Sequence, residues 1–377
     1  MRYLELMFLS VLVVLTSSCN RDEVLTTDLP PEIIVPTHSY KVVVGEEVRI
    51  APKYNNADDA IFEWRGALGA DGFESSERAV VFSSDNAGSA ILYLKVSTSA
   101  GSAEATFDIA VNERLTVYDY TPAPGQFIGE VRTAGFSGEE LCEADAIEYA
   151  ENRLANGYFV SLGAFGGSIT MGINRPIANH DGEDFAIRGN SFDGSSEPGV
   201  VWVMQDENGN GIADDTWYEL KGSETGLDTT YQDYEVTYYR PTSSGMAVSW
   251  TDNMGGSGTV DYLASFHDQP SYYPTWITAD SYTLRGTRLE ARNYDKSGNG
   301  SMWVQPAYGW GYADNASERD CTDGVNRFDI ANAIDGAGES VTLEYIDFVK
   351  VQSAVQSKSG WTGELSTEVC GFWEITE

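Results

Sequence analysis

The sequence predicts an all-β protein built from two β-sandwiches. Its 377 residues include 38 glycines and 21 tyrosines, which favour many short strands and turns over long helices. Apolar and polar residues alternate in short runs along most of the chain, which is typical of strands with one buried face. At roughly 150 residues per domain, this length indicates two domains or three.

The charge of the chain excludes one class of partner and disfavours another. The chain carries 58 acidic and 23 basic side chains, which gives a formal net charge of −35. Nucleic acid is excluded because its phosphate backbone needs a cationic surface, and electrostatic docking on anionic lipid is disfavoured. Two explanations of the acidity remain: a solubilising surface, or carboxylates gathered around metal ions.

Residues 1–18 have the features of a signal peptide. Their apolar run, residues 6–15, is too short to span a bilayer. Ser17 and Ser18 before Cys19 resemble the lipobox of bacterial lipoproteins, which implies that the cysteine is lipidated and begins the mature chain. An ordinary secretory signal is the alternative.

An acidic stretch, residues 20–23, directly follows Cys19. It resembles the surface-export signal of Bacteroidota lipoproteins. This resemblance implies a protein that is lipid-anchored in the outer membrane, faces the cell exterior and contacts the membrane through its lipid alone.

Three cysteines remain after the lipidation site: Cys142, Cys321 and Cys370. Their odd number excludes a fully paired disulfide framework, although one bridge with a free thiol stays open. The sequence contains no CxxC motif, so it does not support a zinc or redox site.

Residues 37–112, which follow an acidic tether over residues 19–36, predict the first and smaller sandwich. Short strands separated by turn signals are typical of an immunoglobulin-like fold. Trp64 lies in one of these strands and is expected in the core. Residues 92–111, LYLKVSTSAGSAEATFDIAV, resemble the hairpin of PKD-type (polycystic kidney disease) domains. The resemblance implies a spacer.

Residues 114–377 predict a larger, jelly-roll-like sandwich with one short helix, and this is the expected ligand-binding domain. The helix is expected over residues 139–155, capped by Ser137, with an apolar face made of Leu141, Ala144, Ile147, Ala150 and Leu154. The remainder reads as strands, at residues 169–173, 199–204, 234–239, 283–291 and 340–351.

The strongest local motif is the segment 206–215, DENGNGIADD. Oxygen-bearing side chains at alternate positions, with a glycine at the sixth, resemble calcium loops of the EF-hand or dockerin kind. The expected ligands of a structural calcium ion are Asp206, Asn208 and Asn210 by side chain, Ile212 by its carbonyl, and Asp214 or Asp215. The usual twelfth-position glutamate is replaced by Trp217. An acidic β-hairpin turn is the alternative.

A second acidic cluster lies in the segment DCTDGVNRFDIANAID, and its members are Asp320, Asp323, Asp329 and Asp335. Asp329 could pair with Arg327, or the set could hold another ion. The alternative is a solvated loop with a cap for a short helix over residues 330–334.

Enzymatic motifs are absent from the sequence, so we expect a protein that is not an enzyme. It contains three histidines and no GxSxG, HExxH or phosphate-loop motif. Glu197 could pair with Glu364 or Glu368 as the two carboxylates of a glycosidase. In so acidic a chain, such pairs also arise by chance.

Two Gly- and Pro-punctuated segments, residues 266–276 and 308–312, are rich in aromatic residues. Exposed aromatic rings on loops stack flat ligands at little entropic cost. The expected ligand contacts are Tyr272, Tyr273, Trp276, Trp310 and Tyr312. The alternative is that these rings fold back over the end of the sandwich.

Several segments of the second domain resemble a recurring family of bacterial cell-surface proteins. They are residues 158–192, residues 195–224, NRFDIANAID (326–335), and residues 346–355 with 360–369. The resemblance is to Bacteroidota surface lipoproteins with a PKD-like domain, found beside TonB-dependent transporters that include those for cobalamin. It implies capture of an extracellular ligand, with cobalamin or another corrinoid first, for handover to such a transporter. A glycan-binding or adhesion module is the alternative.

Overall fold

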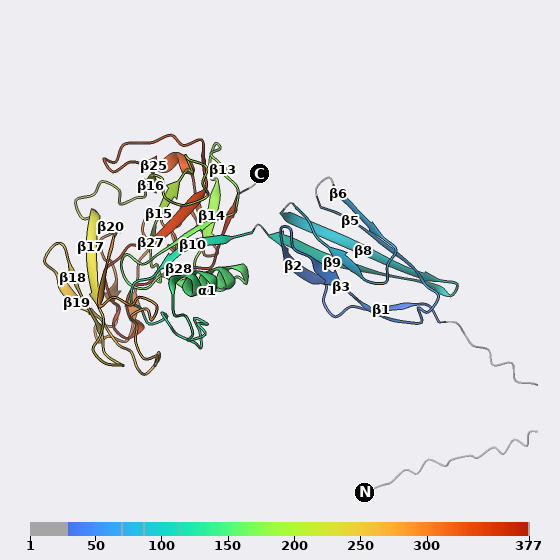
Figure 1. Cartoon of the computed structure of the whole chain (residues 1–377), viewed down its shortest axis with the longest axis horizontal. Coiled ribbons are helices and arrows are strands. Elements are labelled where there is room, and N and C mark those ends of the chain that lie inside the picture. The colour runs from blue at the N-terminus through green and yellow to red at the C-terminus, as the bar shows by residue number, and fades with distance from the viewer. Residues whose placement is uncertain (1–28, 69–70, 86, 113, 376–377) are drawn as a thin grey trace, which may run out of the picture. The chain divides into compact units, whose positions relative to one another are not determined.

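The computed structural model describes residues 29–68, 71–85, 87–112 and 114–375. It divides into two compact units, residues 1–112 and 113–377, which are described separately here (Figure 1). The expected signal peptide, Cys19 and most of the tether lie outside the described residues. No helix in the described ranges is both long and apolar enough to cross a membrane.

Unit 1 is an immunoglobulin-like sandwich. Its main sheet has the order β2 (Ser39–Val43), β9 (Gly101–Asn112), β8 (Gly88–Thr98), β5 (Ile61–Leu68) and β6 (Asp71–Ser75). Two strand pairs complete it: β1 (Glu32–Ile34) with β4 (Lys53–Asn55), and β3 (Val48–Ile50) with β7 (Val80–Phe82). Trp64 is buried, as expected, and its indole N–H donates to the Glu77 carbonyl at 2.9 Å.

Unit 2 is built on a six-stranded antiparallel sheet. Its order is β10 (Thr116–Thr121), β12 (Ser168–Gly172), β27 (Phe348–Ser353), β15 (Gly199–Met204), β16 (Trp217–Leu220) and β25 (Ala333–Ile334). A four-stranded sheet has the order β23 (Cys321–Thr322), β24 (Val325–Phe328), β14 (Phe185–Arg188) and β29 (Gly371–Glu374). The main core combines apolar side chains of both sheets with the buried face of helix α1 (Glu143–Ala155).

A second four-stranded sheet has the order β19 (Ser257–Val260), β18 (Val248–Asp252), β17 (Tyr231–Tyr239) and β20 (Ser281–Arg288). Three short pairs are β11 (Val160–Ser161) with β28 (Glu368–Val369), β13 (Ile177–Ala178) with β26 (Tyr345–Ile346), and β21 (Tyr294–Asp295) with β22 (Trp303–Val304). The short 3₁₀ helices are η1 (Ile330–Asn332) and η2 (Gly360–Thr362). The predicted all-β fold class with one short helix is confirmed.

Helix α1 begins four residues later than the sequence predicts, and its N-cap is Cys142 rather than Ser137. The Asp145 carboxylate accepts hydrogen bonds from the backbone N–H groups of Leu141 (2.9 Å) and Cys142 (3.1 Å), which fixes this start. Leu141 therefore lies outside the helix and is exposed. Ala144 lies within the helix and is exposed too. The buried face consists of Ala146, Tyr149, Ala150 and Leu154.

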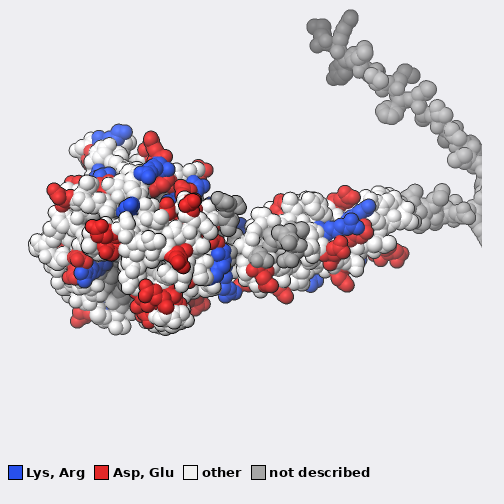
Figure 2. Space-filling view, turned by 90° about the horizontal axis from the view of Figure 1, so that it is seen from above, with Lys and Arg blue, Asp and Glu red and all other residues white. Residues whose placement is uncertain are grey.

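Acidic side chains are scattered over the visible surface of both units, with fewer basic ones between them (Figure 2). This distribution fits the first explanation of the charge, a solubilising coat. The three later cysteines are free thiols: Cys142 is exposed, and Cys321 and Cys370 are half-buried.

Candidate ligand-binding site

The six-stranded sheet of unit 2 has one apolar face and one face that is aromatic and polar. Side chains alternate between the faces of a strand, so residues paired across strands share a face. On one face, residues such as Val201, Val203, Val349 and Val351 enter the core. The strand register places a row of different chemistry on the other face: Asp119, Thr170, Lys350, Trp202 and Glu219, one from each of β10, β12, β27, β15 and β16.

Lys350 lies against two indole rings on this face. Its Nζ atom is 4.4 Å from the ring centroid of Trp217 and 5.2 Å from that of Trp202, within the range of a cation–π interaction. Burial lowers the pKa of Lys350 to about 8, and the nearby Asp119 carboxylate opposes this shift. Among the described residues, Lys350 makes no ion pair.

A cavity of about 320 Å³ opens beside these rings. Its lining includes Trp202, Trp217, Glu219, Lys350 and Gln352 from the six-stranded sheet, Gln232 and Asp233 from β17, Arg285 and Gly286 from β20, and residues 334–336. The site therefore lies where the six-stranded sheet meets the sheet that contains β17 and β20.

Gly286 permits this close approach of the two sheets. A Cβ atom built on Gly286 would lie 1.8 Å from Gln352 Oε1 and 2.4 Å from its Cδ. The same Gln352 oxygen accepts a hydrogen bond from the backbone N–H of Thr287 at 3.1 Å. A side chain larger than that of glycine would separate β20 from β27 or displace Gln352.

The polar groups of the cavity are held by neighbours. The Thr287 hydroxyl donates a hydrogen bond to the Glu219 carboxylate, and burial raises the pKa of Glu219 to about 7. Arg285 pairs with Asp233 at 2.8 Å, and its Nε lies 3.8 Å from the Glu235 carboxylate. Aromatic rings beside positioned carboxyl, amide and cationic groups suit a ligand that has both an apolar face and hydroxyl or charged groups.

The aromatic residues singled out from the sequence lie elsewhere, and four of the five are buried. The exposed fraction is at most 2% for Tyr272, Tyr273 and Tyr312 and is 7% for Trp276. Their partners are internal: the Tyr273 hydroxyl donates to the Ala279 carbonyl, and the Tyr312 hydroxyl accepts from the Glu224 N–H. The expectation of an exposed stacking surface is therefore wrong for these four, because their hydroxyls and rings complete the core.

Trp310, the fifth of these residues, is half-buried, and the Arg319 guanidinium lies 4.3 Å from its ring centroid. The sequence reasoning missed Trp202 and Trp217. They occupy the two strands that flank residues 205–216, and Trp202 interrupts the otherwise aliphatic run Val200–Met204. Neither residue carried a distinguishing signal in the sequence, because a tryptophan in a strand is usually a core residue, as Trp64 is.

The predicted calcium loop gathers most of its expected ligands in one turn. The Asp206 carboxylate accepts hydrogen bonds from the backbone N–H groups of Gly209 (2.7 Å) and Gly211 (2.8 Å). The amides of Asn208 and Asn210 donate to Asp214 at 3.2–3.3 Å, and Asn208 also donates to Asp215. The Ile212 side chain is exposed, and its carbonyl accepts from the Asp214 N–H. The side-chain oxygens of Asn208 and Asn210 accept from the backbone N–H groups of Asn210 and Ile212. These oxygens and the carboxylates are the groups that would hold a calcium ion.

A second loop, residues 295–301, has the same arrangement, an aspartate that accepts backbone N–H bonds from its own turn. The sequence analysis did not identify it. Asp295 accepts hydrogen bonds from the Ser297 and Gly300 N–H groups, and Asn299 accepts from the Ser301 N–H. The common pattern is Asp, then Ser or Asn two and four residues later, then glycine.

The acidic residues of the 320–335 segment serve separate turns. Asp329 caps η1 by accepting from the Ala331 N–H at 2.8 Å, Asp320 accepts from the Gly311 N–H, and Asp335 accepts from the Ala337 N–H. Arg327 lies 3.6 Å from the Glu183 carboxylate, so it makes its ion pair there and not with Asp329, the pairing considered from the sequence. This geometry favours the capping interpretation of the segment.

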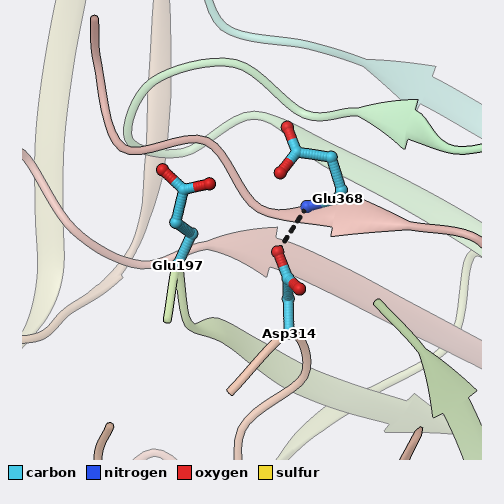
Figure 3. A group of neighbouring side chains, drawn as sticks. All are labelled: Glu197, Asp314 and Glu368. Carbon is cyan, nitrogen blue, oxygen red and sulfur yellow. Dashed lines mark hydrogen bonds between the residues drawn. The ribbon is translucent and has the colours of Figure 1, made fainter. Parts of the chain in front are cut away.

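Three carboxyl groups meet inside unit 2 (Figure 3): those of Glu197, Asp314 and Glu368, of which one oxygen each lies within 4.8 Å of the others. The Asp314 carboxylate accepts backbone hydrogen bonds from Asn190 and Ser191 (2.8 Å each) and from Glu368 (3.0 Å). Burial and mutual repulsion raise the pKa of Glu197 to about 8, and burial raises that of Asp314 to about 7.

These groups do not form the glycosidase pair considered from the sequence. The structure does bring Glu197 and Glu368 together, but Asp314 is fully buried and Glu368 is 3% exposed. Glu364 is also buried, and one of its oxygens accepts from the Gln126 N–H at 2.7 Å. A glycosidase needs both carboxyl groups in contact with a sugar, whereas Asp314 and Glu368 are buried and Glu197 alone of the three is partly exposed.

Comparisons with known proteins identify the first unit. Residues 30–98 match the family model of the PKD-like domain. No curated protein matches the chain.

Solved structures with some likeness include the PKD domain of human KIAA0319 (14% identity, 26% of this chain and 92% of that one, TM-score 0.20). Another is a carbohydrate-binding module of the β-sandwich superfamily (11% identity, 93% of this chain and 99% of that one, TM-score 0.23). A third is SGBP-B of the Bacteroides ovatus mixed-linkage glucan utilization locus, in complex with a heptasaccharide (9% identity, 73% of this chain and 97% of that one, TM-score 0.18). At such TM-scores they place no constraint on the ligand of unit 2.

Proposed function

We propose that unit 2 binds a glycan and that this chain is a binding protein, not an enzyme. The observation that carries the proposal is the pair of indole rings, Trp202 and Trp217, at a cavity of about 320 Å³ that also presents Glu219, Lys350 and Gln352. The C–H face of a sugar ring packs against an indole, while its hydroxyls need donors and acceptors at the rim. This face of the sheet supplies both.

A corrinoid, the first ligand suggested by the family resemblance, is less well supported. The aromatic loops expected to stack such a ligand have mostly buried rings. The cavity volume is at the lower end of the range for ligand sites, roughly 300–1,000 Å³, and suits one or two sugar rings better than a large macrocycle. Cobalamin therefore enters the test as a competing ligand.

Affinity electrophoresis in gels that contain different polysaccharides, followed by calorimetry with oligosaccharides, tests the proposal. We expect a retarded band with at least one polysaccharide and loss of this retardation in Trp217→Ala. Trp361→Ala is the matched control, because Trp361 is about half exposed and lies outside the cavity. Loss in the control with retention in Trp217→Ala would place the site elsewhere. Heat with cobalamin and none with any glycan would overturn the proposal.

We also propose that the chain is a surface lipoprotein whose PKD-like unit acts as a spacer and which passes its ligand to a TonB-dependent transporter. The support is the sequence of residues 1–23 and the family resemblance. In Cys19→Ser we expect the protein to move from the membrane fraction to the soluble fraction. Protease added to intact cells should degrade the unaltered protein; full protection would exclude the outward-facing location.

A structural calcium ion in the loop 206–215 is a further proposal. Its support is the run of oxygen-bearing side chains in one loop, in which Asn208 and Asn210 are hydrogen-bonded to Asp214 or Asp215 and Asp206 holds the turn. The loop joins β15 to β16, the strands that carry Trp202 and Trp217. An ion there would therefore also stabilise one side of the candidate ligand site.

A further inference from the structure

The positive charge of Lys350, at the centre of the candidate site, is not balanced by an ion pair within the described residues. Lys350 is half-buried and lies on two indole rings. The Asp119 carboxylate acts on it electrostatically, but no carboxylate of the described residues forms an ion pair with it. A partly buried ammonium group without an ion-pair partner is costly, and cation–π contacts offset only part of that cost. A ligand that places an anionic group against Lys350 would offset the rest of that cost.

The other charged groups around the cavity have partners within the protein. Arg285 is paired with Asp233 and lies near Glu235. Asp335 accepts hydrogen bonds from two backbone N–H groups in its own turn. Glu219 is hydrogen-bonded to Thr287. Lys350 is thus the cation of this cavity that is available to a ligand.

We infer that the site recognises a sugar that carries a carboxylate, as a uronic acid does, with the carboxylate against Lys350 and the ring against an indole. This inference rests on the proposed glycan-binding function. The ligand is a glycan with isolated acidic residues rather than a polyanion, because the chain has a net charge of −35 and a densely charged polymer would be repelled. Asp233 and Asp335, which also line the cavity, add to that repulsion.

Calorimetry with a matched pair of oligosaccharides tests the inference on the unaltered protein. One oligosaccharide carries a single glucuronic acid, and the other is the same molecule with its carboxylate reduced to the alcohol. We expect the acidic form to bind about tenfold more tightly. Equal affinity for the two forms would overturn the inference while leaving glycan binding intact, whereas no binding of any glycan would overturn the proposed function itself.

Variants then assign the preference to Lys350. Lys350→Met keeps an unbranched apolar stem between the rings, so we expect the two oligosaccharides to bind equally. Lys350→Arg keeps the charge and should keep a preference. Lys358→Met is the matched control, since Lys358 is half exposed, pairs with Asp261 and does not line the cavity. A tenfold preference that survives in a folded Lys350→Met protein would contradict the assignment.

Discussion

Lys350 illustrates how strand register determines a site at the scale of single residues. It is opposite Trp202 on one neighbouring strand and Thr170 on the other, so these side chains share a face. A shift of one residue in the pairing of β27 would bury Lys350 in the core and expose Val349 or Val351 instead. Register, rather than loop composition, places the candidate ligand contacts.

Gly286→Ala should damage the site through one contact. The added Cβ would meet the Gln352 amide, so Gln352 or β20 must move. We expect a loss of about 1–3 kcal/mol in the free energy of unfolding, as for overpacked cores, together with weaker glycan binding. Denaturant titration and calorimetry measure the two effects. Gly336→Ala is the control: Gly336 also lines the cavity, but a Cβ there has no neighbour within 4 Å. Similar losses in both variants would contradict this explanation.

The cluster of Glu197, Asp314 and Glu368 should make stability depend on pH. Burial and repulsion raise the pKa of Glu197 to about 8 and that of Glu368 well above its ordinary value. A carboxyl group with a raised pKa keeps a proton in the folded state that the unfolded chain has released. Stability is therefore lost as the pH rises from the ordinary value, 4.5, to about 8, by about 1.4 kcal/mol per pH unit for each proton kept.

We expect the melting temperature to fall from pH 5 to pH 8 and to fall less steeply in Glu368→Gln, because an amide does not titrate. Melting curves at half-unit pH steps measure the slope. Glu148→Gln, on the exposed face of α1, controls for the removal of one negative charge. The acidic surface contributes to the slope in every protein, so the difference between the two variants is the quantity that matters. Identical slopes would contradict a proton held by the cluster.

At the scale of elements, the sequence predicted the type of each secondary-structure element better than the residues at which it begins and ends. The apolar runs predicted as strands at residues 169–173 and 199–204 are strands β12 (Ser168–Gly172) and β15, because burial of one or both faces leaves a clear pattern. The start of α1 was missed, since Ser137 suits an N-cap by its residue type whereas the cap in the fold is Cys142, whose N–H the Asp145 carboxylate binds. The prediction of exposed rings in the aromatic segments 266–276 and 308–312 was wrong for a related reason. Gly and Pro mark turns but do not show which rings point into the core.

The loop between β15 and β16 gives the element-scale prediction. If calcium binds residues 206–215, chelation should lower the melting temperature by several degrees, because the ion stabilises the folded state alone. Asp206→Ala should melt at that lower temperature and respond no further to chelator. Scanning calorimetry with and without EDTA measures this. Asp181→Ala, at another exposed aspartate, should keep the response. An unchanged melting curve of the unaltered protein in EDTA would exclude the site.

At the scale of the whole molecule, the composition was sufficient to predict the fold class. Glycine-rich turns and short alternating runs indicated two sandwiches, and the helix pattern occurred once. The candidate site could not be predicted in the same way. It joins residues from β15, β16, β20 and β27, which are far apart in the sequence, and their neighbourhood depends on sheet order rather than on any local motif.

The two units should be independent in both stability and binding. Among the described residues, the core of unit 1 consists of side chains from residues 33–111. The three apolar clusters of unit 2 consist of side chains from residues 115–372, so no side chain belongs to the cores of both units. Each unit then buries its own apolar surface, which is the main driving force for folding. We expect a protein that consists of residues 113–377 to fold and to bind the glycan with the affinity of the longer chain, since every residue of the candidate site lies within it.

Calorimetry of residues 113–377, of residues 29–112 and of the two units joined tests this independence. The joined protein should show two unfolding transitions at the temperatures of the separate units, and oligosaccharide should raise the temperature of the unit 2 transition alone. Trp217→Ala in the joined protein should abolish that shift without moving the unit 1 transition. A single transition, or a weaker affinity of residues 113–377 alone, would show that the PKD-like unit contributes to the folding or to the binding of unit 2. The spacer role would then be wrong.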